Sequence, residues 1–282
     1  MKKNLSVLER IYVGLVIFFL YAPILVLIVF SFNSANSTAV FAGFSFKWYG
    51  VLFQNTAAMK SLENTLILAV ISSVCATVLG TAAAIGINAM RSKFLRMTTK
   101  TITDIPMMNP DIVTGISMML LFVFAGTLLH RTGVLGFGTL LIAHITFNLP
   151  YVVLSVLPKF SQMDRNLIDA AEDLGCTPVQ AFFKVTLHEI MPGIMTGLIM
   201  SFTLSLDDFV ISYFTSGPAF QTLPILIFSM TKKRVTPDMY ALSAILFVSI
   251  LVLLILINLL QRRGEEHSTS AINNEKKTGE EI

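Results

Sequence analysis

The sequence predicts an all-α polytopic membrane protein with six transmembrane helices, and three features support this. Hydrophobic residues make up 54% of the 282 residues and charged residues only 13%, against roughly 25% charged in ordinary soluble domains. The mean hydropathy is +0.74. Six apolar stretches reach the roughly 20 residues that a helix needs to cross a bilayer. They are Ile11–Phe32, Leu66–Met90, Ile105–Leu129, Val134–Leu157, Ile190–Phe214 and Tyr240–Leu260.

The first stretch is expected to remain in the mature protein. It follows the basic residues Lys2, Lys3 and Arg10, as the core of a signal peptide would. It is too long for such a core, however, and no clean A-x-A cleavage pattern follows it. We therefore interpret Ile11–Phe32 as a retained span.

Aromatic residues crowd the segment Phe41–Phe53, which is expected to lie on the outer side of the membrane. Trp48, the only tryptophan, lies near its centre. Amphipathic rings are typical of the membrane–water interface, so the segment fits an interfacial belt. The alternative is a docking surface, or an aromatic face over which a cationic ligand passes.

Small residues on the second and fifth stretches predict close helix contacts. Ala76, Gly80 and Ala84 recur at every fourth position, and Gly193 and Gly197 form a G-x-x-x-G pattern. This spacing places small residues on one face of a helix, where two backbones can approach each other. Helix packing alone explains the pattern.

Three carboxylates, those of Asp111, Asp207 and Asp208, lie within the apolar stretches. An acid at membrane depth costs about 2.5–3.5 kcal/mol on insertion scales, so it usually faces the bundle interior or a wet path. Pro106 and Pro110 predict a broken or kinked helix entry beside Asp111. Each acid could have a purely structural role, but we favour contact of at least one of them with a cationic substrate.

Asp207 and Asp208 are neighbours, so on a helix they point about 100° apart and cannot both face one narrow path. We expect one of them to face the path. The other is expected to pair with a hydroxyl group, such as that of Ser205 or Ser212, or with a neighbouring helix.

The loop between the fourth and fifth stretches is rich in charge and predicts two short helices around a tight turn. Asp164 can cap the first helix, and Gly175 is suited to the position just past its end. Thr177–Gln180 combines a capping threonine, a proline at the first helical position and a glutamine at the third. A stiff helix-turn-helix on one face of a membrane protein offers a lever to a soluble partner.

Basic residues indicate the orientation of the chain. With the N-terminus inside, the inner loops carry about twice as many lysines and arginines as the outer ones, which favours cytoplasmic N- and C-termini. The Lys232-Lys233-Arg234 cluster lies on the outer side, within an amphipathic stretch, Leu223–Met239. The predicted organisation is a cytoplasmic N-terminus (1–10), one six-helix domain (11–263) and a disordered cytoplasmic tail (264–282).

Several function classes lack their sequence signals. Cys75 and Cys176 lie on different segments and predict neither a disulfide framework nor a metal site. The histidines lack metal-ligand spacing, and no P-loop motif occurs. The sequence therefore predicts no metal, no cofactor, no nucleic-acid partner and no enzymatic activity of its own, so an energised transporter must use a separate motor.

The charged loop resembles the EAA motif in permease subunits of binding-protein-dependent ABC importers. That motif reads E-A-A, three residues, G, nine residues, then I-x-L-P. Two positions depart from it: Asp169 replaces the glutamate and His188 replaces the proline. The matching positions are Asp169-Ala170-Ala171, Gly175, Val185 and Leu187.

Other segments resemble the spermidine/putrescine permease subfamily, most of all the second of its two permease subunits. These segments extend over nearly the whole chain. They are Tyr21-Ala22-Pro23, Ser31-Phe32-Asn33-Ser34, Lys47-Trp48-Tyr49, Asn64-Thr65-Leu66, Pro110-Asp111-Ile112-Val113, Ala143-His144-Ile145-Thr146-Phe147 and Ser201–Phe209.

The resemblance implies the type I importer permease (MetI-like) fold in a bacterial cell membrane. It also implies a second permease subunit in a heterodimer, two ATP-binding subunits and an extracellular or periplasmic polyamine-binding protein. The coupling loop would span about 158–189. Residues expected to contact the ATPase are Asp169, Ala170, Ala171, Gly175 and Leu187, and those expected along the substrate path are Asp111, Asp207, Asp208, Ser205 and Trp48.

Three alternatives remain at this level. The cargo could be another solute, although an oxyanion would fit poorly beside three acids. An intramembrane aspartyl protease could use Asp111 with Asp207 or Asp208, but Leu204-Ser205-Leu206-Asp207 lacks the G-x-G-D pattern of that class. A proton-coupled carrier could use buried acids but would not need the capped loop.

Overall fold

The computed structural model describes residues 7–35, 40–164, 166–232, 239–252 and 255, which form helices and no β-strand. Five helices are long and apolar enough to cross a membrane, and Met239–Val252 is apolar but shorter. The all-α, multi-spanning class is confirmed, while the described residues supply five full-length spans rather than six. The predicted sixth span, Tyr240–Leu260, extends past the described residues. The five are Leu8–Ser31, Thr56–Ala89, Asp111–Leu128, Phe137–Gln162 and Pro178–Asp207.

Two compact units make up the chain, one from Met1–Lys60 with Leu226–Leu256 and the other built mainly from Ser61–Ile225. The first unit contains α1 (Val7–Ser31), α2 (Lys47–Gln54) and the helix Met239–Val252. The helices α3 (Thr56–Ala89) and α11 (Leu223–Thr231) cross the boundary between the units. Most of the predicted N-terminal segment 1–10, the tail 264–282, and Lys233 and Arg234 of the basic cluster lie outside the described residues.

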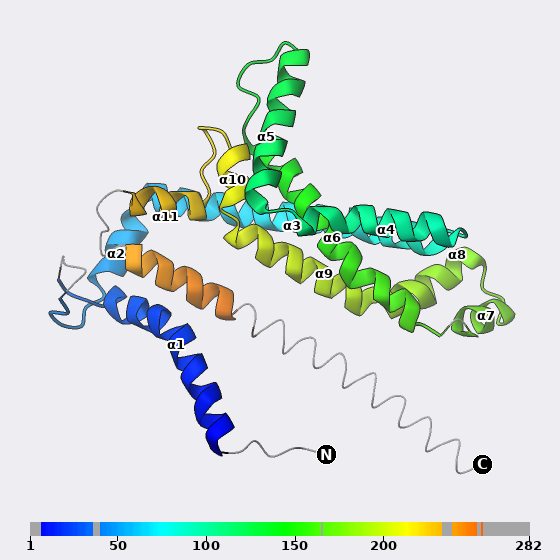
Figure 1. Cartoon of the computed structure of the whole chain (residues 1–282), viewed down its shortest axis with the longest axis horizontal. Helices are drawn as coiled ribbons and strands as arrows, with labels where there is room; N and C mark the ends of the chain where they lie inside the picture. Colours follow the sequence, from blue (N-terminus) through cyan, green and yellow to red (C-terminus); the bar gives the residue numbers. More distant parts are fainter. Residues whose placement is uncertain (1–6, 36–39, 165, 233–238, 253–254, 256–282) are drawn as a thin grey trace. The chain divides into compact units, whose positions relative to one another are not determined.

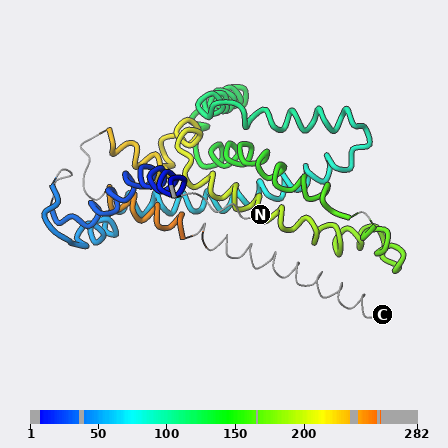
Figure 2. The backbone as a smooth tube through the Cα atoms, turned by 60° about the horizontal axis from the view of Figure 1, so that its bottom comes forward, coloured from blue at the N-terminus to red at the C-terminus, as the bar shows by residue number. Residues whose placement is uncertain are grey.

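The second unit is built around α6, which packs along α9 and against α3, α4 and α10 (Figure 1). In both views α4 runs along this bundle, whereas α5 turns away from the direction of α4 (Figure 2). The short helix α10 packs against α5. The helices are α3 (Thr56–Ala89), α4 (Lys93–Met108), α5 (Asp111–Leu128), α6 (Phe137–Gln162), α9 (Leu187–Asp207) and α10 (Val210–Thr215).

Two predicted spans are interrupted. The predicted span Ile105–Leu129 begins inside α4, and the helix breaks at Asn109, whose ψ is 142°. Proline clashes with a helical conformation of the residue before it, so Pro110 forces this break. The predicted Ile190–Phe214 is also two helices, because Asp208 adopts an extended conformation with ψ 120°. Both breaks fall beside a membrane carboxylate.

The predicted small-residue faces are packing faces. A Cβ atom on Gly80 of α3 would lie 2.7 Å from Val152 Cβ, and one on Gly197 of α9 would lie 3.2 Å from Val152 Cα. Val152 of α6 is fully buried between these two glycines. The absence of side chains at Gly80 and Gly197 therefore lets α3 and α9 approach the α6 backbone at one level.

Replacing Gly193 by alanine is expected to destabilise the protein. Its new Cβ atom would lie 2.8 Å from the Ser155 carbonyl oxygen and 2.8 Å from Lys159 Cγ, so α9 would have to move away from α6. Overpacking of this kind costs about 1–3 kcal/mol, which a lower melting temperature of the purified protein would report.

Gly86→Ala is the matched control, because nothing lies within 4 Å of the Cβ position at Gly86. Alanine also favours the helix over glycine, so this variant should be neutral or more stable. Equal melting temperatures for the two variants would count against close packing at Gly193.

Candidate substrate path and coupling surface

A buried network of polar side chains lies where α3, α6, α9 and α10 meet. The ring of His144 is at its centre and is 1% exposed. His144 Nδ1 lies 3.2 Å from Ser205 Oγ, and His144 Nε2 lies 3.0 Å from Ser212 Oγ. Asn148 donates to Ser205 Oγ at 2.7 Å, and Ser72 Oγ lies 2.9 Å from the same atom. Four helices are therefore joined through hydrogen bonds between their buried side chains.

Ser205 has one proton to donate and two lone pairs, and Asn148 donates to one of them. The directions of its contacts with Ser72 and His144 follow from the tautomer of His144. His144 Nε2 lies 3.0 Å from Ser212 Oγ and 3.4 Å from Asp208 Oδ2, so one ring nitrogen faces both groups.

Asp208 belongs to this network and also begins the next helix. Its carboxylate accepts the backbone N–H groups of Ile211 at 3.2 Å and Ser212 at 2.7 Å, two of the donors that the first turn of a helix leaves unpaired. The side chain is only 8% exposed. Asp208 is therefore held in place by His144 and by the start of α10.

Asp207 is the last residue of α9 and is exposed. One of the two neighbouring acids, Asp208, is thus paired inside the protein, as expected, while Asp207 is exposed. The assumption that both lie on one continuous helix is wrong, because the helix ends between them.

Asp111 is exposed in the first turn of α5, close to the same region. One turn further along α5, a Cβ atom on Gly115 would lie 3.0 Å from the Phe214 ring and 3.4 Å from the Val210 carbonyl oxygen of α10. Of the three acids in the predicted spans, Asp111 and Asp207 are therefore the exposed ones, and both lie on elements that the buried network and the α5–α10 contact hold together.

Trp48 lies in the first unit and is 9% exposed. Its indole N–H donates to the Asn33 carbonyl oxygen at 2.7 Å, and Lys47 Nζ lies 5.0 Å from its ring centroid. The neighbouring rings of Phe44 and Phe46 are instead exposed and contact each other. Trp48 is thus a packed anchor of the aromatic segment.

The charged loop has the capped structure that its sequence predicts. Helix α7 (Asn166–Asp173) is closed by the turn at Gly175, which has φ +87°. The N–H of Gly175 bonds to the Glu172 carbonyl oxygen at 2.9 Å, and that of Cys176 bonds to the Ala171 carbonyl oxygen at 3.0 Å. This is the Schellman pattern that closes a helix with a left-handed residue.

The second short helix, α8 (Pro178–Ala181), opens with the predicted capping box. Gln180 N–H donates to Thr177 Oγ1 at 3.4 Å, and Thr177 N–H donates to Gln180 Oε1 at 3.0 Å. At the entry to α7, the Asn166 N–H donates to Asp164 Oδ1 at 3.0 Å. Both short helices therefore have fixed starting points.

The loop continues without interruption into a long helix. After α8, one stretch of π-helix, Phe182–Thr186, leads into α9 at Leu187. The helical run Pro178–Asp207 has 30 residues, roughly 45 Å at 1.5 Å per residue. The loop lies at one end of this rod and Asp207 at the other.

The solvent-exposed surface of the loop could contact a partner protein. Asp169 and Ala170 are exposed, whereas Ala171 and Leu187 are half-buried. Three apolar side chains with no cover in the described part of the chain extend this surface. They are Leu174 (88% exposed), Val179 (67%) and Phe183 (61%).

His144 and Asn148 are two site residues that were not predicted from the sequence. Both lie in the fourth predicted span, four residues apart and hence on one helix face. Buried polar side chains in a membrane span need partners, so this pair was a usable signal. Their partners on α3, α9 and α10 come from distant parts of the sequence and could not be assigned without the fold.

The chain is similar in sequence to known permease components of transport systems. Residues 76–265 match the family described as "Binding-protein-dependent transport system inner membrane component". The putrescine transport system permease protein PotI of Escherichia coli (strain K12) is 40% identical over 233 residues, 81% of this chain and 81% of PotI. The spermidine/putrescine transport system permease protein PotC of the same strain is 37% identical over 254 residues, 90% of this chain and 94% of PotC.

A solved structure shows the same fold. One chain of a bacterial ABC transporter involved in the import of the acidic polysaccharide alginate matches with a TM-score of 0.71 at 18% identity, over 91% of this chain and 95% of that chain. This likeness confirms the importer-permease fold that the EAA-like loop predicts. The chain therefore belongs to the family of inner-membrane permease components of binding-protein-dependent transport systems.

Proposed function

We propose that this chain is a permease subunit of an ATP-driven ABC importer that moves polyamines of the spermidine and putrescine class into the cell. The observation that carries the proposal is the identity of 37–40%, over most of the chain, to permeases named for putrescine and for spermidine/putrescine. Two exposed carboxylates beside the buried network suit a polycation. Uptake of radiolabelled putrescine and spermidine by the reconstituted transporter, with and without this chain, tests it.

The partners follow from the same proposal. Two ATP-binding subunits supply the energy, since the chain has no P-loop motif, and an external binding protein delivers the polyamine. A second, homologous permease completes the path as a heterodimer. The first span supports such a partner or lipid contact, because none of its most apolar window is buried within the chain. The coupling loop and both termini face the cytoplasm.

ATP binding would act on the chain through the loop. A groove on one ATP-binding subunit grips α7 and the exposed apolar residues around it, such as Leu174, and the other ATP-binding subunit grips the second permease. Both short helices are capped, so movement of the loop is transmitted rather than absorbed by fraying. The helical run Pro178–Asp207 carries this movement to the membrane carboxylates.

The polyamine would meet Asp207 and Asp111 in this scheme. Ammonium groups exchange part of their hydration for carboxylate oxygens, in a site weak enough to release the cargo. Asp208 and Ser205 do not need to touch the substrate, because both are engaged in the His144 network. Their role is to hold the end of α9 against α10. Trp48 serves the fold of the first unit.

Neutralising the exposed acid is expected to reduce transport without preventing assembly. Asp207→Asn removes a charge from the path and should lower polyamine uptake roughly ten-fold, the effect of losing about 1.4 kcal/mol of interaction with the ammonium group. Uptake in proteoliposomes measures this, and Asp207→Glu should restore most of it because the charge returns. Uptake by Asp207→Asn equal to wild type would remove Asp207 from the path.

Asp208→Ala should behave differently from Asp207→Asn. It leaves His144 and two N–H groups of α10 without their acceptor, and loss of a helix cap alone costs about 0.5–2 kcal/mol. We expect a lower melting temperature and a lower yield of assembled complex. A fully stable complex with lowered uptake would instead place Asp208 in contact with the substrate.

Gly175 tests the coupling loop through its backbone. A side chain at this position has free space, since nothing lies within 4 Å of its Cβ position, but φ is +87°. Gly175→Ala is therefore expected to strain the turn by about 1–2 kcal/mol and to lower both uptake and polyamine-stimulated ATP hydrolysis. Gly175→Asn, which tolerates this conformation better, should retain more of both activities. Equal loss in the two variants would show that the φ angle is not what matters.

A further inference from the structure

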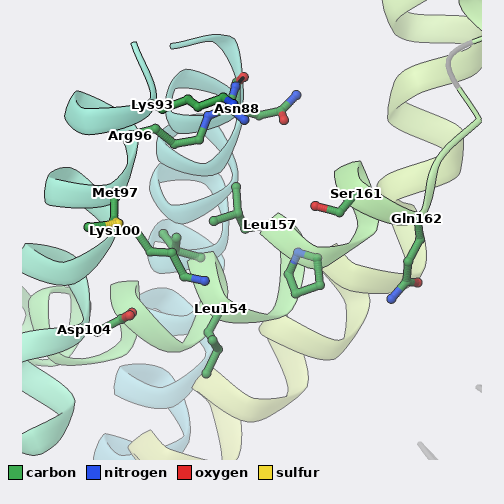
Figure 3. A pocket seen from close by; sticks show the side chains of 12 residues that line it. Asn88, Lys93, Arg96, Met97, Lys100, Asp104, Leu154, Leu157, Ser161 and Gln162 are labelled. Carbon is green, nitrogen blue, oxygen red and sulfur yellow. Dashed lines mark hydrogen bonds between the residues drawn. The ribbon is translucent and has the colours of Figure 1, made fainter. Parts of the chain in front are cut away.

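A cavity of about 510 Å³ opens between α3, α4 and α6, at the end of these helices that leads into the coupling loop (Figure 3). It is separate from the His144 network and contains none of the residues assigned above to the substrate path or to contact with the ATPase. Most of the charged lining residues come from α4, and most of the apolar lining residues come from α6. The ones used here are Lys93, Arg96, Lys100, Asp104, Leu154 and Leu157.

The basic side of the cavity includes a fixed guanidinium group. Arg96 Nη2 donates to the carbonyl oxygens of Asn88 at 2.6 Å and Met90 at 3.0 Å, at the end of α3. Arg96 Nε is buried and has no hydrogen-bond partner in the described part of the chain. Lys93 and Lys100 lie one turn before and one turn after Arg96, so α4 presents three positive charges along one face. Asp104 offsets only one of them.

The other side of the cavity is apolar. Leu154, Leu157 and Pro158 of α6 line it together with Met97 of α4. Figure 3 shows the charged groups of Lys93 and Arg96 beside Asn88, with Leu157 and then Leu154 further along the cavity. Lys100 and Asp104 lie nearer to Leu154 in this view, so the end with Lys93 and Arg96 is suited to an anion and the leucine side to a hydrocarbon chain.

We propose that this cavity binds an anionic phospholipid, with the phosphate against Lys93 and Arg96, the exposed Lys100 side chain turned toward it, and an acyl chain along Leu154 and Leu157. Basic pockets between membrane helices on the cytoplasmic side hold such headgroups, and the position of the cavity on that side rests on the orientation given in the proposed function. A polyamine is repelled by the net positive charge. A free phosphate ion would leave the apolar wall in contact with water.

Native mass spectrometry of the purified four-subunit complex tests the proposal by titration with phosphatidylglycerol, with phosphatidylcholine as the neutral comparison. Each basic side chain near an anionic lipid contributes about five-fold in affinity. Lys100→Gln should therefore weaken phosphatidylglycerol binding about five-fold, and Lys93→Gln/Lys100→Gln together about 30-fold. Arg131→Gln, which removes one positive charge from the loop between α5 and α6, should leave binding unchanged.

A second variant separates the cavity from general surface charge. Ser161→Trp keeps every charge but places an indole in the cavity that Ser161 lines, and it should also weaken binding. Wild-type affinity in both the double-lysine and the Ser161→Trp variants would overturn the proposal. So would equal binding of phosphatidylcholine, or complete displacement of the lipid by millimolar inorganic phosphate.

The lipid readout does not depend on transport. A complex that binds phosphatidylglycerol in the expected pattern but takes up no polyamine would refute the proposed function and leave the lipid site standing. A complex that imports polyamine, but whose cavity variants bind phosphatidylglycerol as wild type does, would support the proposed function and refute the lipid site.

Discussion

The close approach of three helices at Val152 is the constraint on which the rest of the second unit depends. Gly80 and Gly197 contact this side chain from opposite helices, so α3, α6 and α9 lie close enough for short side chains to meet. Each of the three helices also carries one member of the polar network. It lies on the same helix face as Gly80, Val152 or Gly197, about two helical turns away. These members are Ser72, His144 and Ser205. Larger residues at the glycines would separate hydroxyl groups that now lie about one hydrogen bond apart.

The polar network also determines the different environments of Asp207 and Asp208. Asp208 is drawn inward by His144 and by the N–H groups of α10, which ends α9 and leaves Asp207 exposed at its tip. An aspartyl protease would need two carboxylates that share a proton. Here Asp208 is committed to an imidazole and a helix start, and the chain belongs to a permease family. The arrangement suits an acid that meets a passing cation.

Features set by neighbouring residues could be predicted from the sequence, and those set by distant ones could not. The caps around Gly175 and Thr177 are confirmed because their hydrogen bonds close within a few residues. The break at Pro110 follows from proline geometry. The break after Asp207 was missed because its cause, the contact of Asp208 with His144, joins residues far apart in sequence. The amphipathic helix α4 was missed because its charges were assigned to a loop.

We propose that a separate ATP-consuming motor moves this bundle through the loop and the helical run Pro178–Asp207. The most direct test is putrescine uptake by proteoliposomes that contain the permease pair, with or without the ATP-binding subunits, in the presence of the binding protein and ATP. The account predicts accumulation only when the ATP-binding subunits are present and ATP is hydrolysed. Accumulation of putrescine by the permease pair alone would contradict it.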